Sequence, residues 1–197
     1  MISMKTIKFI SILGILLFLN ISCRLVTVDP GQVYRSPQPT AEHLENYIQN
    51  YGIKTVINLR GENPSKQWWI EEHEIVKKYD LTFINISMSA KHLPHRKNLI
   101  KLLDAYKTAP RPILIHCLAG VDRTGEATAI YQMLYMGKSK EEALKMLTPE
   151  YGYFEKFKPA KKYFIEHVWQ DENWAYEQYN PCLGQYKFYD THQKACL

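Results

Sequence analysis

The stretch ILIHCLAGVDRTGEAT at residues 113–128 decides how this sequence folds. It opens with the short, apolar, β-branched run that is typical of a buried parallel strand, and it closes on residues that favour a helix. Between the two stand a cysteine, the five residues 118–122 and then Arg-Thr-Gly. Ligands of open α/β sheets bind where a strand ends and a helix begins, so this junction is predicted to hold a ligand.

The residue types of this junction suit an anion held over a nucleophile. The backbone N–H groups of residues 118–122 and the N-terminus of the following helix supply positive potential. Cys117 faces that helix and Arg123, which favours its thiolate, and the planar fork of Arg123 grips two oxygens of a phosphate. His116 is expected to hydrogen-bond within the loop, and Thr124 to donate its hydroxyl to the sulfur. The predicted phosphate-binding residues are Leu118, Ala119, Gly120, Val121, Asp122 and Arg123.

The rest of the sequence alternates between strand and helix patterns. Strands are predicted at 53–59, at 81–87 and in a segment ending at His116; helices are predicted at 40–51, 68–78, 98–106, 124–136 and 159–169. This alternation is typical of an α/β protein with a single, mainly parallel central sheet flanked by helices. The 197 residues, of which 46% are apolar, are enough for one compact core.

The loop HCLAGVDRTG, with its flanking strand and helix, resembles the H-C-x5-R-T-G signature of cysteine-based protein tyrosine and dual-specificity phosphatases. The stretch VYRSPQPTAEHLENYIQNYGIKTVINLRGEN at residues 33–63 is similar to the beginning of small atypical dual-specificity phosphatases of bacteria, fungi and plants. The resemblance implies the tyrosine phosphatase fold and a hydrolase of phosphoric monoesters. It implies that Cys117 attacks phosphorus, that Arg123 holds the oxygens and that water hydrolyses the phosphocysteine. No metal or other cofactor is expected.

The residue that protonates the leaving oxygen is open. Most members of that family carry an aspartate on an upstream loop, but the corresponding SMSAKHLPHRK at residues 87–97 has no Asp or Glu. One alternative is Asp122, which as a plain structural residue would only stabilise the helix N-terminus. A second is His92 or His95, since histidine titrates near neutral pH. The third is no acid at all, which good leaving groups tolerate.

The same loop predicts a positive rim that would help to capture a substrate with several phosphates. Its members are Lys91, His92, His95 and Arg96, and the alternative is a solvated entrance to the next helix. Arg60 either faces the same opening or forms an ion pair with Glu62 or Glu71. Trp68 and Trp69 indicate core or lid packing.

Two substrate classes and two other protein classes follow from these residues. The first substrate class is phosphotyrosine or a related phosphomonoester of a phosphoprotein. The alternative is an inositol polyphosphate, an inositol pyrophosphate or a phosphoinositide, because cysteine phytases have similar C-x-A-G-V-x-R-T loops. A rhodanese-like sulfurtransferase and a non-catalytic phosphate-binding module are the remaining hypotheses. A net charge of +5 is too mild to indicate a nucleic-acid partner.

The N-terminal sequence MISMKTIKFISILGILLFLNISC at residues 1–23 has the three-part layout of a signal peptide. Residues 1–22 are therefore predicted to direct export. Cys23 resembles the lipidated cysteine of bacterial lipoproteins, which would make the protein periplasmic or anchor it to the membrane. The alternative is an uncleaved N-terminal anchor.

The remaining chain is divided into a phosphatase domain at 24–169 and an aromatic-rich tail at 170–197. The tail is expected to form a strap packed by Trp174, Tyr176 and Tyr179. Cys182 and Cys196 either pair in a disulfide, as an exported protein allows, or stay as free thiols.

Overall fold

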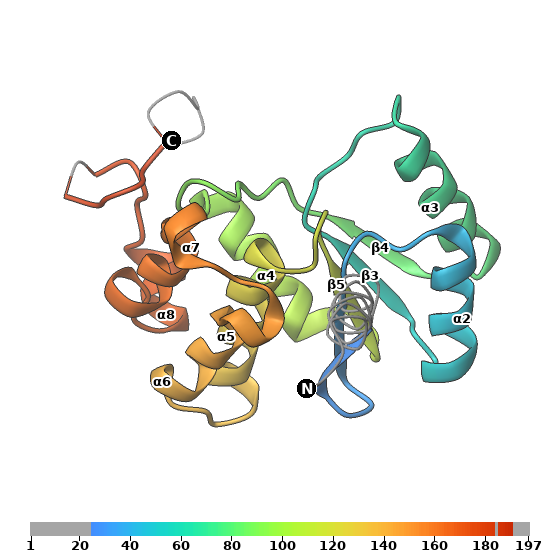
Figure 1. The fold of residues 1–197 in the computed structure, drawn as a ribbon, viewed down its shortest axis with the longest axis horizontal. Helices are drawn as coiled ribbons and strands as arrows, with labels where there is room; N and C mark the ends of the chain where they lie inside the picture. The colour runs from blue at the N-terminus through green and yellow to red at the C-terminus, as the bar shows by residue number, and fades with distance from the viewer. Residues whose placement is uncertain (1–24, 184, 191–197) are drawn as a thin grey trace, which may run out of the picture.

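The computed structural model describes residues 25–183 and 185–190, and it holds one central sheet with helices on both sides (Figure 1). The predicted signal peptide, Cys23 and Cys196 lie outside the described residues. The strands are β1 (Val26–Asp29), β2 (Val33–Ser36), β3 (Thr55–Asn58), β4 (Thr82–Asn85) and β5 (Ile113–His116). The helices are α2 (Ala41–Tyr51), α3 (Gln67–Lys78), α4 (Arg96–Thr108), α5 (Asp122–Tyr135), α6 (Lys140–Ala143), α7 (Pro159–Tyr163) and α8 (Glu172–Glu177), with short 3-10 helices at Leu144–Leu147, Pro149–Tyr151 and Glu155–Phe157.

The sheet has the order β1-β2-β5-β3-β4. Strand β5 pairs in parallel with β2 on one side and β3 on the other, and β4 pairs in parallel with β3. Strand β1 runs antiparallel to β2, in contrast to the other strand pairs of the described residues. The predicted single, mainly parallel sheet is therefore confirmed, and the strand that leads to the cysteine loop lies at its centre.

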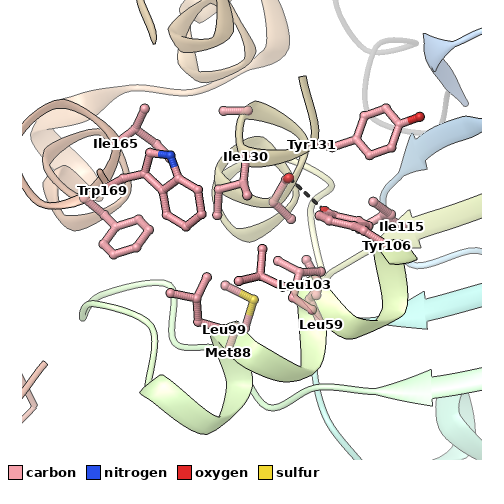
Figure 2. Close-up of a cluster of buried hydrophobic side chains, with 14 of the residues drawn as sticks. Leu59, Met88, Leu99, Leu103, Tyr106, Ile115, Ile130, Tyr131, Ile165 and Trp169 are labelled. Carbon is pink, nitrogen blue, oxygen red and sulfur yellow. Dashed lines mark hydrogen bonds between the residues drawn. The ribbon is translucent and has the colours of Figure 1, made fainter. Parts of the chain in front are cut away.

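Alternation along the strands divides the core into two parts. Ile113 and Ile115 of β5 point into the larger cluster, where they meet α4 and α5. Leu114 points into the smaller cluster, under α2 and α3. Because successive side chains of a strand point to opposite faces, a continuous apolar strand covers both clusters at once. Figure 2 shows the larger cluster, in which the Tyr106 hydroxyl donates to the Ala127 carbonyl at 2.8 Å.

Helix ends follow their capping residues. Helix α2 begins after Thr40, whose hydroxyl accepts from the His43 backbone N–H at 3.2 Å, and it ends at Gly52, which has φ of 65°. Helix α5 begins two residues earlier than the predicted 124–136, because a carboxylate in the first turn is stabilised by the helix dipole. Asp122 and Arg123 therefore stand on the rigid first turn of a helix rather than on the loop.

The C-terminal part departs from one regular helix. The predicted helix 159–169 continues beyond α7 as a π-helix at Phe164–Val168. After it, Trp174 and Tyr179 are buried in the same cluster as the helices of the main body. The Tyr179 hydroxyl donates to the Pro94 carbonyl at 2.7 Å, so the tail packs as a strap over the 87–97 loop.

Cys182 is disulfide-bonded. Within the described ranges, 25–183 and 185–190, no helix has the length and apolar character needed to cross a membrane.

Candidate active site

The cysteine loop lies at the carboxyl end of β5, between the ends of β2 and β3. Cys117 is only 1% exposed. Gly120 has φ of 69°, and a Cβ on it would stand 2.4 Å from the Pro37 nitrogen and 2.6 Å from the Ser36 carbonyl carbon. The loop therefore packs directly against the chain that leaves β2, and this approach requires glycine.

Arg35 on β2 holds the loop from behind. Its Nη2 donates to the Gly120 carbonyl at 2.8 Å and to the Val121 carbonyl at 3.1 Å, while its Nη1 donates to the Met146 carbonyl at 3.2 Å and the Thr128 hydroxyl at 3.4 Å. Because these two loop carbonyls are held toward β2, the peptide units of the loop are fixed in one orientation. The planar guanidinium of arginine can donate from two separate nitrogens to acceptors on different segments, whereas lysine has a single ammonium nitrogen.

The positive charge of Arg35 is itself buried, since only 1% of the residue is exposed. Burial lowers the pKa of Arg35 to about 10, and Cys117, Tyr151 and Asp122 oppose this effect. The guanidinium is thus still protonated near neutral pH and adds positive potential beneath the cysteine loop. Arg35 was not among the site residues predicted from the sequence, although an arginine within the short strand VYRS is an unusual residue for a buried position.

The structure brings Cys117 and Thr124 together and docks the neighbouring Arg123 on the backbone that follows β3 and β4. The Cys117 sulfur lies 3.7 Å from the Thr124 hydroxyl. Arg123 Nη1 donates to the Leu59 carbonyl at 3.2 Å and to the Met88 carbonyl at 3.5 Å. The Arg123 Nε is buried, and no described residue is its partner. The guanidinium is therefore docked on the strand ends with a donor left over for an anion.

His116 is oriented by a residue that the sequence analysis did not identify. Its Nε2 lies 2.6 Å from Glu72 Oε1 on α3, and its Nδ1 lies 3.4 Å from the Cys117 carbonyl. The other Glu72 oxygen accepts from Gln38 Nε2 at 3.1 Å. His116 and Glu72 are both almost completely buried. No local pattern marks Glu72, because it is one of several acidic residues on an amphipathic helix.

Asp122 lies on the first turn of α5 and is partly buried. Burial raises the pKa of its carboxyl, while Lys158, Arg123 and Lys161 oppose the rise. Asp122 therefore keeps its proton to a higher pH than a free aspartate, as a proton donor requires.

The 87–97 loop faces the tail rather than forming a free basic rim. His92 Nδ1 and His95 Nε2 lie 3.4 Å and 3.8 Å from the same Asp190 oxygen. His95 is only 3% exposed, so its prediction as a rim residue is wrong: the tail covers it. Arg96 is exposed, but its guanidinium donates to the Tyr176 carbonyl. Lys91 is exposed, and its role in a rim stays a prediction.

The loop between β5 and α5 offers groups that bind anions: its backbone N–H groups, the N-terminus of α5 and the guanidinium of Arg123. In the described part of the chain, no three His, Cys, Asp or Glu side chains are grouped so that they could hold a metal ion.

Comparison with protein families decides the relationship. Residues 27–165 match the family described as DSP-PTPase phosphatase fused to NAD+ kinase. The chain belongs to this DSP-PTPase phosphatase family. The resemblance that the sequence suggested is thereby confirmed, and the matched region of the DSP-PTPase runs from β1 into the π-helix.

Individual relatives agree with this assignment. This chain is 31% identical over 100 residues to the dual specificity protein phosphatase Mpk3 of Drosophila melanogaster. The aligned residues make up 51% of this chain and 23% of Mpk3. The chain thus spans about a quarter of that protein.

Two solved structures share the fold of this DSP-PTPase. The core catalytic domain of the PP-IP phosphatase Siw14 from S. cerevisiae is 24% identical, with a TM-score of 0.62, and the match covers 76% of this chain and 86% of that domain. TpbA of P. aeruginosa is 21% identical, with a TM-score of 0.57 and coverage of 77% and 88%.

Proposed function

We propose that this chain is a cysteine-dependent phosphatase that hydrolyses phosphotyrosine and related phosphomonoesters. The observation that supports this most directly is the docked Arg123, whose buried Nε has no partner among the described residues. Arg123 stands on the first turn of α5, directly after the loop that carries the buried Cys117. Arg35 holds the Gly120 and Val121 carbonyls of that loop toward β2. Membership of the DSP-PTPase family supports the same chemistry.

In the first step, the Cys117 sulfur bonds to phosphorus as the bond between phosphorus and the ester oxygen breaks. Arg123 and the loop N–H groups hold the three other oxygens, on which negative charge accumulates. Protonated Asp122 gives its proton to the departing oxygen, so that the product leaves as a neutral alcohol or phenol.

In the second step, water attacks the phosphocysteine. The Asp122 carboxylate takes a proton from that water. The water oxygen bonds to phosphorus as the sulfur–phosphorus bond breaks. Inorganic phosphate leaves and Cys117 returns to the thiolate. The Thr124 hydroxyl, 3.7 Å from the sulfur, stabilises the thiolate as it forms.

The first test measures hydrolysis of para-nitrophenyl phosphate and a phosphotyrosine peptide by wild type and Cys117→Ser. We expect turnover by wild type and none by the variant. Equal background rates in both proteins would favour a non-catalytic phosphate-binding module. Conversion of cyanide with thiosulfate, without phosphatase activity, would favour the rhodanese-like alternative.

A second test identifies the acid. For Asp122→Asn, the rate should fall steeply for aryl phosphates with poor leaving groups and little for good ones, because only poor leaving groups need a proton. Glu74→Gln, an exposed carboxyl on α3, is the control. A uniform fall across the series, together with a leaving-group dependence in His92→Ala, would assign the proton to His92 instead.

A second candidate substrate class is supported by the fold likeness to a PP-IP phosphatase. It comprises inositol polyphosphates, inositol pyrophosphates and phosphoinositides. A panel of phosphotyrosine peptide, phosphoinositide and phytate, compared by kcat/KM, decides between the two classes.

We further propose that the chain is an exported bacterial lipoprotein tethered through Cys23. Residues 1–23 support this by their charged start, apolar centre and terminal cysteine. Labelling of expressing cells with a palmitate analogue should mark the wild type and not Cys23→Ser. An unlabelled, cytoplasmic wild-type protein would contradict the proposal.

A further inference from the structure

A second arginine stands beside the catalytic one at the carboxyl edge of the sheet. Arg60 follows Leu59, whose carbonyl accepts from Arg123 Nη1 at 3.2 Å. Arg60 also bridges to Ser87, next to Met88, whose carbonyl is the other acceptor for Arg123. The two arginines thus share the same two strand ends.

The Arg60 side chain is held in place from two directions. Its guanidinium carbon lies 3.4 Å from the centre of the Trp68 ring, which is a stacked cation–π contact. Its Nη1 donates to Gln38 Oε1 at 2.8 Å. The Gln38 backbone N–H in turn donates to the Leu118 carbonyl at 3.1 Å, so the same residue fixes both Arg60 and the cysteine loop.

The charges around Arg60 are not balanced. Burial and the positive charge of Arg123 lower the pKa of Arg60, and Glu72 and Cys117 oppose them. Glu72 is already engaged by His116 and Gln38. In the described ranges, neither arginine forms an ion pair with a carboxylate. Two neighbouring guanidinium groups that form no direct ion pair repel one another, and an anion bound between them would offset that repulsion.

We propose that Arg60 binds a second phosphate group of the substrate, next to the phosphoryl group that Arg123 holds over Cys117. The site would therefore bind a substrate with two closely spaced phosphates more tightly than a substrate with a single phosphate, such as phosphotyrosine. Trp68 and Gln38 are positioning residues, because they hold the guanidinium so that its remaining N–H groups are free to bind. This inference rests on the proposed function for the identity of the first phosphate site.

Binding of inorganic phosphate and of pyrophosphate, measured by calorimetry on Cys117→Ser, tests this proposal without turnover. Pyrophosphate should bind at least about 10-fold more tightly than phosphate, because a charge-assisted hydrogen bond to the second group contributes that much or more. Adding Arg60→Gln should abolish most of this preference while the dissociation constant of phosphate changes less. Lys101→Gln removes one exposed charge on α4 and should leave the preference intact.

Arg60→Lys serves as the second variant, because it keeps the charge and loses the planar stack on Trp68. It should retain part of the preference, and thermal melting checks that all variants fold. The proposal is overturned if Arg60→Gln weakens phosphate and pyrophosphate by the same factor, or if no preference exists before substitution. Hydrolysis of para-nitrophenyl phosphate by the wild-type protein, in which Cys117 is intact, is measured separately. A failure of catalysis is therefore distinguishable from a failure of the second phosphate site.

Discussion

Replacing Arg35 with lysine tests whether the cysteine loop depends on a guanidinium fork behind it. The substitution keeps a buried positive charge on β2 but removes the second arm of the fork. One nitrogen cannot reproduce the four hydrogen bonds that Arg35 donates to oxygen atoms, at 2.8–3.4 Å, on three separate segments. The carbonyls of Gly120 and Val121 would then have to share one ammonium nitrogen with the Met146 carbonyl and the Thr128 hydroxyl.

The magnitude follows from those two carbonyls. A buried acceptor left without a partner costs about 1–3 kcal/mol, and because these two bonds are only partly buried, losing one or both costs roughly 1–3 kcal/mol in total. Part of this lowers the free energy of unfolding and part lets the loop peptides rotate. Because loss of one aligned donor to a developing anion costs about 10²–10³ in rate, we expect kcat/KM to fall by at least about 100-fold.

The assay compares kcat/KM for para-nitrophenyl phosphate with urea denaturation for Arg35→Lys and for Arg111→Lys. Arg111 is a matched control, because its guanidinium also donates to a backbone carbonyl, that of Tyr106 at 2.8 Å, but far from the loop. Arg111→Lys should lose stability with kcat/KM unchanged. If Arg35→Lys behaves in the same way, the loop does not need the fork and the reasoning is refuted.

Two further predictions concern buried positions near the loop. Lys161 Nζ lies 2.9 Å from a Glu126 oxygen, both side chains are fully buried, and burial raises the pKa of Glu126 to about 7. Lys161→Met should therefore cost about 3–5 kcal/mol of unfolding free energy at pH 8, because the buried Glu126 must then either stay charged without a partner or bind a proton that the unfolded chain does not hold; the cost should be much smaller at pH 5, where Glu126 is protonated. Urea denaturation at both pH values checks this, and adding Glu126→Leu should restore most of the loss; equal losses at both pH values would contradict it. Gly120→Ala should abolish para-nitrophenyl phosphate hydrolysis, since the added Cβ would stand 2.4 Å from the Pro37 nitrogen. Gly137→Ala is the control and should remain active, because Gly137 also has a positive φ, of 64°, but no atom lies within 4 Å of the added Cβ. An active Gly120→Ala enzyme would show that the loop tolerates displacement.

Features that are contiguous in the chain could be predicted from the sequence. The strand ending at His116, the loop and the following helix are one segment, so Cys117, Arg123 and Thr124 stand close together in the chain. The capped helix after Thr40 is equally local, because its first turn supplies the groups that the cap satisfies. These elements agree with the structure to within two or three residues.

Contacts between distant segments could not be predicted in this way. His95 reads as a basic residue on an exposed loop, yet the tail buries it beside Asp190. Glu72 reads as one acid among several on α3, yet it pairs with His116. In both cases the partner is chosen by packing, and sequence patterns carry no information about which distant surface arrives.

The sequence by itself determined the α/β fold class and the strand, loop and helix around Cys117, and it predicted Cys117 as the nucleophile of an anion-binding loop, because each depends on residues close together in the chain. Only the tertiary structure decided what holds that loop. The order of the sheet places β2 beside β5, so that Arg35 reaches the Gly120 carbonyl across 85 residues of sequence. The same order brings Arg60 and Arg123 to one edge, because parallel strands end together.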